Sequence, residues 1–293
     1  MRKILVFARN GQLGFELRRT LAPLGEVVAL DFPEVDFTRP DGLRALVETV
    51  APDIIVNPAA YTNVDKAESE STIARLVNCD SVRVLAEEAA RRGIPLIHFS
   101  TDYVYDGSKG AAYRETDPTH PLNVYGQTKL EGDQAIMASG AAAVILRTSW
   151  VYSTRQGGFV TKVLQWARQQ ETLRVVDDQI SSPTSARGLA EATALLLAKA
   201  GEHPLGWFAE KAGVYHCTGG GSCSRYEWAK EIIALDPHKD EQAVRELLPA
   251  KSSEFAVPAN RPLVSVLNSD KLEKVFGLRL PDWKQELKLV MEG

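Results

Sequence analysis

The stretch KILVFARNGQLGFEL, residues 3–17, decides the fold class of this chain. It begins with a short apolar run, continues through a turn that contains Gly11 and Gly14, and ends with leucines spaced as on one face of a helix. A strand, a glycine turn and a helix in this order are typical of a dinucleotide-binding fold, because glycine lets the backbone approach a pyrophosphate at the helix N-terminus. The stretch therefore predicts a cofactor loop rather than an ordinary tight turn.

The residues around this turn carry opposing signals about the cofactor. Ala8 stands where such a turn usually has glycine, and its methyl group is tolerable if its φ is negative. Asp31 ends the next apolar run, about 20 residues on, and can accept hydrogen bonds from the ribose hydroxyls of NAD. Arg9 lies in the turn itself and can bind the 2′-phosphate of NADP. We therefore expect the chain to use both NADPH and NADH.

Short apolar runs alternate with amphipathic segments over the first half of the chain. The runs cover residues 3–8, 26–30, 53–57, 94–100 and 142–149. This alternation indicates a parallel sheet with helices on both faces, a doubly wound α/β fold. We expect a NAD(P)-binding Rossmann domain over residues 1–150. Residues 151–293 are expected to form a smaller C-terminal α/β substrate-binding region, with some segments returning to the first domain.

Composition argues against several classes of partner. The 293 residues are 44% hydrophobic and 25% charged, and the formal net charge is −4. This balance gives no electrostatic case for nucleic acid or an anionic membrane, and no apolar run reaches the roughly 18 residues of a transmembrane helix. The three cysteines lack the spacing of a disulfide framework or a zinc site. We expect a soluble cytoplasmic protein with a small-molecule ligand.

Four polar residues in two neighbouring segments carry the predicted chemistry. Thr101 and Asp102 follow the run 94–100, at the edge of the sheet where ligands bind in open α/β folds. Tyr125 and Lys129 are four residues apart on a predicted helix and so share one face. A nearby ammonium and a nicotinamide's positive charge can lower the Tyr125 pKa from about 10 to about 7, which suits acid–base catalysis.

These residues suggest a division of roles in which Tyr125 moves the proton. Thr101 would donate a hydrogen bond to a substrate carbonyl, and Asp102 would contact a neighbouring hydroxyl or tune the proton transfer. The Tyr-x-x-x-Lys spacing alone is common by chance on surface helices. The upstream glycine turn and the Thr101–Asp102 pair favour the catalytic interpretation. His98, which lies within a predicted strand, is interpreted as a packed core residue.

Longer stretches of the sequence are more specific than the Tyr-x-x-x-Lys spacing. DIIVNPAAYTNVDKAESE, HFSTDYVYDG, ETDPTHPLNVYGQTKLEGD, ILRTSWVY, VVDDQISSPTS and ANRPLVSVLNSDKL resemble the dTDP-4-dehydrorhamnose reductase family, within the extended short-chain dehydrogenases/reductases. The resemblance runs from about residue 2 to residue 283. It implies reduction of the C4 ketone of dTDP-4-dehydro-L-rhamnose to dTDP-L-rhamnose, a precursor of cell-surface polysaccharides, with NADPH or NADH.

The resemblance also implies roles for individual residues. It makes Tyr125 the proton donor, and Lys129 the residue that binds the nicotinamide ribose and lowers the Tyr125 pKa. The remaining implied cofactor contacts are Gly11, Gln12, Leu13, Asp31, Asp36, Phe37, Ala60, Tyr61 and Thr62. The implied substrate contacts are Val64, Thr101, Asp102 and Trp150.

The same resemblance argues against a bound magnesium ion. The resemblance implies that some members of the family form dimers, in which carboxylates of the two subunits hold a bridging magnesium ion. Glu16 matches one such position, whereas Arg187 stands at the other. A cation site that gains a guanidinium loses the oxygen ligands that magnesium needs. We therefore expect no bound metal and a monomer or weak homodimer.

Two other functions remain open. One is a related enzyme, either another nucleotide-sugar reductase or an epimerase or dehydratase. A dehydratase typically has Asp-Glu after the threonine, whereas Asp102 is followed here by Tyr103. The other is a catalytically silent, nucleotide-binding regulatory subunit, against which the intact Thr101, Tyr125 and Lys129 argue. An NADPH oxidation assay separates an enzyme from a silent subunit.

Overall fold

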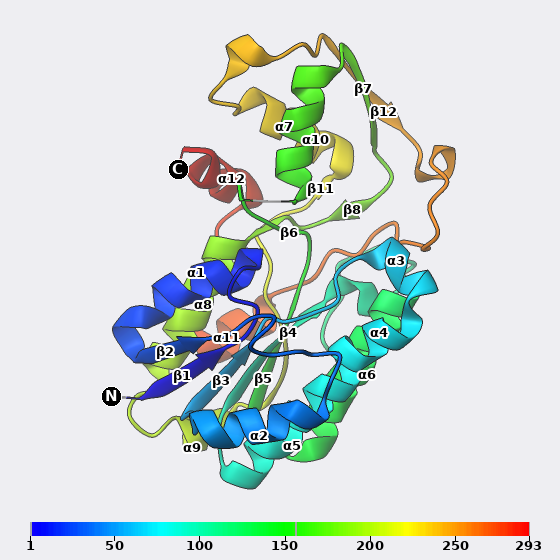
Figure 1. Ribbon diagram of the computed structural model, residues 1–293. Helices are drawn as coiled ribbons and strands as arrows, with labels where there is room; N and C mark the ends of the chain where they lie inside the picture. The colour runs from blue at the N-terminus through cyan, green and yellow to red at the C-terminus, as the bar shows by residue number, and fades with distance from the viewer. Residues whose placement is uncertain (1, 156, 293) are drawn as a thin grey trace.

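A computed structural model describes residues 2–155 and 157–292 and shows two lobes (Figure 1). The larger lobe is built on a six-stranded sheet in the order β10-β5-β4-β3-β1-β2, in which all neighbours are parallel. Its strands are β1 (Lys3–Val6), β2 (Glu26–Ala29), β3 (Ile54–Asn57), β4 (Leu96–Thr101), β5 (Ala143–Thr148) and β10 (Gly213–His216). The five predicted apolar runs are thus confirmed as strands.

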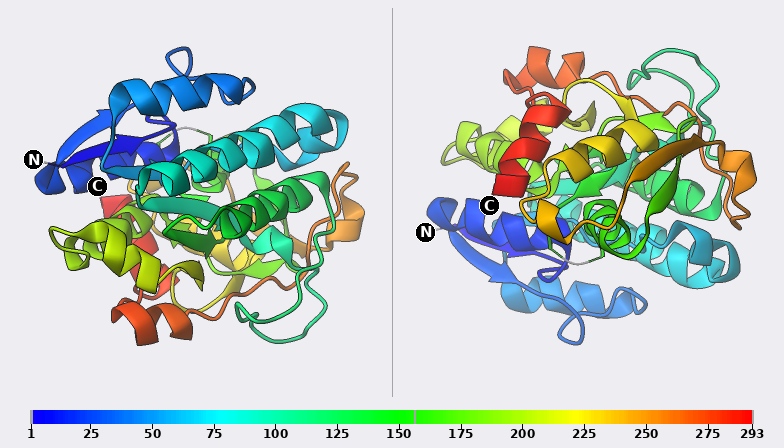
Figure 2. Two further views of the ribbon diagram at one scale, coloured as in Figure 1. Left: turned by 90° about the horizontal axis from the view of Figure 1, so that it is seen from below. Right: turned by 90° about the horizontal axis from the view of Figure 1, so that it is seen from above.

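Helices cover both faces of the sheet, as the two views of Figure 2 show. One face packs against α1 (Gln12–Leu21), α8 (Ala186–Lys199), α9 (Pro204–Glu210) and α11 (Asp270–Phe276). The other packs against α2 (Asp41–Val50), α5 (Ser81–Arg92) and α6 (Val124–Ser139). Leu17 and Leu21 are fully buried in the first layer, and Leu43 and Val47 in the second. The predicted doubly wound fold is confirmed.

The order of the strands fixes where a ligand can bind. From β1 the chain crosses to β2 on one side, and then to β3 on the other side of β1. The connections that follow β1 and β3 therefore diverge at the carboxyl edge of the sheet, which leaves a crevice between them. β4 and β5 end at the same edge, at Thr101 and Thr148.

The turn between β1 and α1 is closed by a hydrogen bond from Gly11 N to Ala8 O of 3.0 Å. A Cβ atom on Gly14 would lie 1.9 Å from Ala8 O, so only glycine lets α1 pack this closely against the turn. Ala8 has a φ of 50°, so the condition under which its methyl group would be tolerated without strain, a negative φ, is not met. The sharp turn requires the left-handed backbone that favours glycine, and the alanine adopts it at a cost.

The smaller lobe comes from the second half of the chain (Figure 1). Its helices and strands are α7 (Phe159–Gln169), α10 (Arg225–Ala234), α12 (Trp283–Glu292), β7 (Thr172–Val176) and β12 (Glu246–Ala250), and β7 pairs with β12 in parallel. Two short pairs lie near the junction of the lobes, namely β6 (Val151–Tyr152) with β9 (Thr184–Ser185), and β8 (Ile180–Ser181) with β11 (Cys223–Ser224). Tyr152, Val163, Trp228 and Leu287 form part of its buried core.

The remaining elements are short. They are η1 (Ala22–Leu24), α3 (Val64–Ser69), α4 (Ser71–Arg75), the π-helical turn η2 (Leu76–Asp80), η3 (Asp102–Val104), η4 (Lys239–Glu241) and η5 (Ser252–Glu254). In the described parts of the chain, no helix combines the length and the apolar character needed to span a membrane.

Candidate active site

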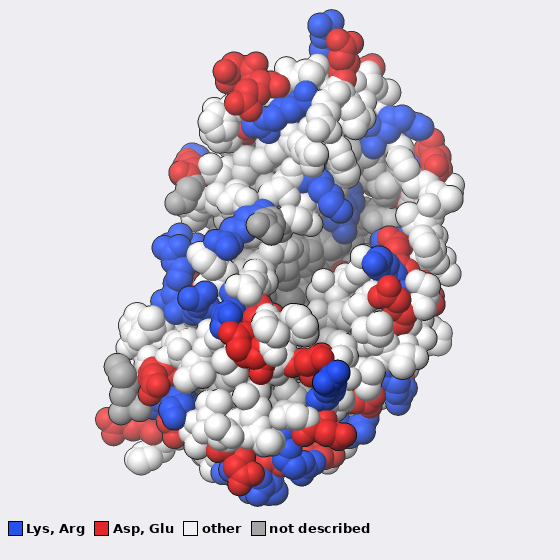
Figure 3. Space-filling model, in the orientation of Figure 1, with Lys and Arg blue, Asp and Glu red and all other residues white. Residues whose placement is uncertain are grey.

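A cavity of about 890 Å³ lies at the carboxyl edge of the sheet. Figure 3 shows the molecule hollowed between its two lobes. The predicted site residues that line this cavity are Gly11, Gln12, Leu13, Ala60, Thr62, Thr101, Asp102, Tyr125, Lys129 and Trp150. The structure therefore brings together the glycine turn, the Thr101–Asp102 pair and the Tyr125–Lys129 pair, which are far apart in the sequence.

The cofactor end of the cavity is formed by the first turn of α1. Gly11 precedes this helix and offers no side chain to cap it, so the cap leaves the first helical N–H groups to a ligand. Those groups and the helix dipole suit the pyrophosphate of a dinucleotide. Gln12 is oriented by the smaller lobe, because Ser153 Oγ donates to its Oε1 at 3.0 Å. These residues fit an NAD(P) cofactor.

The two residues with opposing cofactor preferences lie beside this turn. Asp31 Oδ2 accepts a hydrogen bond of 2.9 Å from the backbone N–H of Asn10. Arg9 Nη2 lies 2.7 Å from a carboxylate oxygen of Glu34. The guanidinium is thus paired on the protein, and a 2′-phosphate would have to compete with Glu34 for it.

Asp31, Asp36, Phe37, Tyr61 and Val64 lie outside the lining of the cavity. Asp36 accepts hydrogen bonds from the backbone and the side chain of a nearby threonine, and Phe37 packs edge-on against a core phenylalanine. The Tyr61 hydroxyl donates to Glu70 at 2.5 Å, and Val64 is the first residue of α3. Their predicted ligand contacts stay predictions.

Asp102 is buried among hydroxyl groups. Its Oδ2 accepts from Ser265 Oγ at 2.5 Å and from Ser181 Oγ at 3.2 Å, and its Oδ1 accepts from Thr101 Oγ1 at 3.1 Å. Burial raises the pKa of this carboxyl to about 6, although the three hydroxyls oppose the effect by favouring the charged form. Sequence reasoning missed Ser181 and Ser265, because nothing in their spacing connects them to Asp102.

Tyr125 and Lys129 lie on α6, whose first turn is fixed by the side chain of Asn123 accepting from Gly126 N at 2.8 Å. Burial raises the pKa of the Tyr125 phenol, and the nearby Asp102 carboxylate adds to this, while a hydrogen bond with Thr101 opposes it. The phenol therefore holds its proton at neutral pH. The lowering of this pKa by Lys129 and a bound cofactor stays a prediction.

Lys129 is buried against β4. Its Nζ donates to Phe99 O at 2.6 Å and lies 3.1 Å from His98 Nε2, and burial lowers its pKa to about 8. His98 has no exposed surface, as expected of a core residue. Its contact with Lys129 was not anticipated. The only available signal was the place of His98, three residues before Thr101 on the same strand.

Trp150 borders the cavity from the smaller lobe. One face of its ring stacks on Trp228, with centroids 5.5 Å apart and planes 12° from parallel. The guanidinium carbon of Arg225 lies 3.8 Å from the centre of the Trp150 ring. Trp150 also has a φ of 42°, a strained backbone that its packing must stabilise. This position at the border of the cavity supports the predicted contact with a sugar nucleotide, which stays a prediction.

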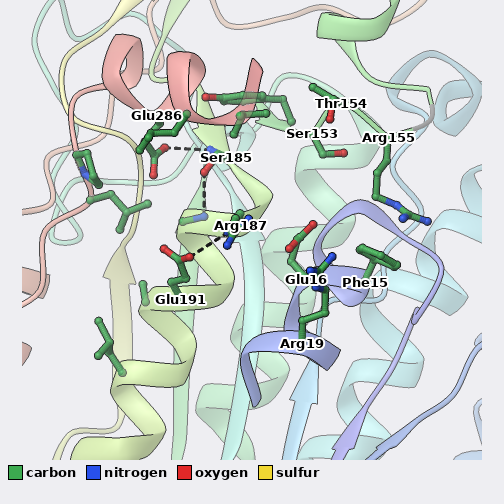
Figure 4. A pocket seen from close by; sticks show the side chains of 18 of the residues that line it. Phe15, Glu16, Arg19, Ser153, Thr154, Arg155, Ser185, Arg187, Glu191 and Glu286 are labelled. Carbon is green, nitrogen blue, oxygen red and sulfur yellow. Dashed lines mark hydrogen bonds and ion pairs between the residues drawn. The ribbon is translucent and has the colours of Figure 1, made fainter. Parts of the chain in front are cut away.

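Glu16 and Arg187 line a second cavity, of about 680 Å³, between α1, α8 and α12 (Figure 4). Arg187 Nε lies 3.1 Å from a carboxylate oxygen of Glu191, one turn further along α8. Glu286 from α12 accepts from Ser185 N at 3.1 Å, and burial raises its pKa to about 7. Within residues 2–155 and 157–292, no group of three or more His, Cys, Asp or Glu side chains could hold a metal ion.

Comparison with known proteins relates this geometry to a family. The family model described as RmlD substrate binding domain matches residues 1–293. The chain is 44% identical to the dTDP-4-dehydrorhamnose reductase of Burkholderia thailandensis, over 96% of this chain and 95% of that protein. It is 40% identical to the enzyme of the same name from Escherichia coli K12, over 98% and 96%.

Solved structures give the same result. The dTDP-4-dehydrorhamnose reductase of Clostridium acetobutylicum is 32% identical, with a TM-score of 0.89 and coverage of 99% of this chain and 98% of that one. That of Bacillus anthracis, solved in complex with NADP, is 30% identical, with a TM-score of 0.89 and 99% coverage of both chains. Full-length matches at these identities, together with a glycine turn, Thr101 and the Tyr125–Lys129 pair around one cavity, show that this chain belongs to the dTDP-4-dehydrorhamnose reductase family.

Proposed function

We propose that this chain reduces the C4 ketone of dTDP-4-dehydro-L-rhamnose to dTDP-L-rhamnose at the expense of NADPH or NADH. The observation that carries the proposal is the single cavity that joins the N-terminus of α1 to Thr101, Tyr125 and Lys129. The named relatives and the NADP complex of the Bacillus anthracis protein support the choice of substrate and cofactor.

The proton needed for the alcohol comes from Tyr125 in this mechanism. A bound nicotinamide cofactor supplies the hydride that reduces the carbonyl carbon. Burial raises the pKa of the Tyr125 phenol, so the phenol is protonated at neutral pH and serves as a general acid toward the carbonyl oxygen. Thr101 lies against both Asp102 and Tyr125 and so positions the carbonyl oxygen for the transfer.

The other site residues bind and orient in this proposal. The first turn of α1, with Gly11, Gln12 and Leu13, holds the pyrophosphate, and Lys129 holds the nicotinamide ribose. Trp150 and the smaller lobe bind the sugar nucleotide. Residues 1–150 thereby supply mainly the cofactor site, and residues 151–293 mainly the substrate site. A cytoplasmic location and the lack of nucleic-acid partners stay predictions from composition and charge.

The proposal is tested by incubating the purified protein with dTDP-4-dehydrorhamnose and NADPH. We expect consumption of NADPH to match formation of dTDP-L-rhamnose. Tyr125→Phe keeps the ring and removes the phenolic proton, so kcat should fall by at least about 10²-fold with little change in NADPH affinity. Tyr226→Phe is a matched control, since the Tyr226 hydroxyl bonds only weakly to Leu247 O in the smaller lobe. A Tyr125→Phe variant that keeps more than about a third of turnover would show that Tyr125 is not the acid.

A further inference from the structure

Three buried polar side chains form a chain across β3, β4 and α6 behind the cavity. Asn57 Nδ2 lies 3.2 Å from His98 Nδ1, and His98 Nε2 lies 3.1 Å from Lys129 Nζ. Asn57 and His98 have no exposed surface, and Lys129 is 1% exposed. At this burial each polar atom needs a partner of matching type. The orientation of the Asn57 amide therefore determines which ring nitrogen of His98 carries a proton, and this in turn bears on the protonation of Lys129.

The orientation of the Asn57 amide fixes the proton on His98. The backbone N–H of Ala59 points at one terminal atom of this amide from 3.2 Å, and because an N–H only donates, that atom is the oxygen. The other terminal atom is the NH₂ group, which also only donates, so His98 Nδ1 must accept. A neutral His98 then carries its proton on Nε2 and aims it at Lys129.

The Nε2–H group of His98 in turn favours one protonation state of Lys129. An ammonium group has three donors and no acceptor, so it would face the Nε2–H of His98 donor to donor. A neutral amine has a lone pair that accepts this proton while one of its own N–H bonds donates to Phe99 O, at 2.6 Å. This arrangement favours the neutral amine of Lys129, docked between His98 and the β4 backbone, over the ammonium form.

We propose that His98 is a positioning residue that holds Lys129 against β4 and favours its neutral amine, so that NAD(P)H must draw this side chain away and, at a pH where Lys129 is neutral, binds with uptake of a proton. This inference rests on the proposed function, in which Lys129 holds the nicotinamide ribose, and it adds that Lys129 does so as an ammonium. It assigns His98 and Asn57 a role in cofactor binding, although neither side chain lines the cavity.

The charged groups around Lys129 are consistent with this assignment. On its own helix, Asp133 favours the ammonium form, but one oxygen of Asp133 is already bonded to Ser100 and to Arg147 of β5, both within 3.0 Å. Tyr125 lies one turn before Lys129 on α6. Burial holds the His98 pKa well below its usual value, and an ammonium on Lys129 lowers it further, whereas a hydrogen bond with the backbone of Asn57 opposes both effects. Burial also lowers the Lys129 pKa to about 8.

The proposal predicts a pH dependence with a definite sign. Above pH 8 Lys129 is neutral before NADPH binds and charged afterwards, so binding takes up about one proton. NADPH affinity should then fall about tenfold for each pH unit above that value. Isothermal titration at pH 9 in two buffers of different ionisation enthalpy measures the proton uptake without sugar nucleotide, and thus independently of turnover.

Asn57→Asp is the sharpest variant, because it keeps the shape of the side chain and replaces the donor toward His98 by an acceptor. The His98 proton should move to Nδ1, and Nε2 should accept from the Lys129 ammonium, whose pKa rises. We expect proton uptake at pH 9 to disappear and NADPH affinity to become nearly independent of pH between 8 and 9. His98→Gln, whose amide oxygen can also accept from an ammonium, should lower the uptake in the same direction.

Two further variants serve as controls. His216→Gln removes a second buried histidine, one that bonds to the Tyr105 hydroxyl, and it should leave the proton uptake unchanged. Lys129→Met should abolish the uptake. Nitrogen-15 NMR of the histidine side chains shows which ring nitrogen of His98 carries the proton in the wild-type protein. We expect the proton on Nε2. A proton on Nδ1 in the wild type, or equal uptake in the wild type and Asn57→Asp, would overturn the proposal, whether or not the protein reduces its proposed substrate.

Discussion

Ser265 Oγ donates a hydrogen bond of 2.5 Å to Asp102 Oδ2, across a separation of 163 residues in the sequence. Ser265 lies in the last part of the chain, yet it bonds directly to a residue that follows β4 of the sheet. The C-terminal segment thereby completes the polar environment of Asp102, on which the orientation of Thr101 depends. This relationship makes the ionisation of Asp102 sensitive to a residue outside the predicted site.

Ser265→Ala should move the acid limb of the pH profile. Burial raises the pKa of Asp102 to about 6, so we expect its carboxylate to lose its charge, and activity to fall, as pH drops through that value. The serine hydroxyl favours the charged form of Asp102, so its removal should shift the midpoint of the acid limb to higher pH by roughly one unit. The measurement is kcat/KM against pH, with Ser182→Ala as the control, because Ser182 donates to Gly221 O instead. An unchanged limb in Ser265→Ala would show that Asp102 does not control the reaction.

The choice of cofactor should follow the carboxylates beside the first turn. Asp31→Ala should weaken the binding of NADH more than that of NADPH. The variant loses an acceptor for the free ribose hydroxyls of NADH, but it also loses a negative charge that repels the 2′-phosphate of NADPH. Arg9→Ala should have the opposite effect. Glu34→Gln releases the Arg9 guanidinium from its 2.7 Å ion pair and should therefore shift the preference toward NADPH. KM values for both cofactors test this, and parallel changes in all three variants would contradict it.

Ala8→Gly should stabilise the protein. The φ of 50° at Ala8 is left-handed, and relief of that strain should raise the free energy of unfolding by about 1 kcal/mol. Ala45→Gly is the matched control: Ala45 lies in the middle of α2, where glycine should cost about 1 kcal/mol. Urea unfolding measures both. If Ala8→Gly were destabilised as much as Ala45→Gly, the backbone at Ala8 would not be strained.

Assembly should not depend on a divalent cation. Arg187 is paired with Glu191 on its own helix, and its guanidinium stands where a magnesium site would need a carboxylate. Light scattering should give the same mass, that of a monomer or weak homodimer, with EDTA and with excess magnesium. Arg187→Glu adds a carboxylate to a cavity that Glu16 and Glu191 also line, and is the variant in which a magnesium response is expected. A metal-dependent change of mass in the wild-type chain would refute the account.

The parts of the fold that depend on local pattern could be predicted from the sequence. The strands, the leucine face of α1 and the end of α5 at Gly93 follow from periodicity and from a glycine with a left-handed backbone. The meeting of Thr101 and Tyr125 followed from the rule that ligands bind at the carboxyl ends of parallel strands.

Other features required the three-dimensional structure. The φ of Ala8 depends on how tightly α1 packs against the turn, which the motif does not specify. The bonds from Ser181 and Ser265 to Asp102 connect segments with no recognisable spacing. His98 was correctly placed in the core, but its contact with Lys129 depends on how α6 packs on β4.

The central claim is that hydride from the nicotinamide reaches C4 of the sugar, and isotope transfer tests it most directly. The protein is incubated with dTDP-4-dehydrorhamnose and NADPH that carries deuterium at the transferred position of the nicotinamide, and the product is analysed by NMR. The account predicts dTDP-L-rhamnose with deuterium at C4 and loss of this product in Tyr125→Phe. Recovery of an isomerised sugar without NADPH oxidation, or deuterium at another carbon, would contradict it.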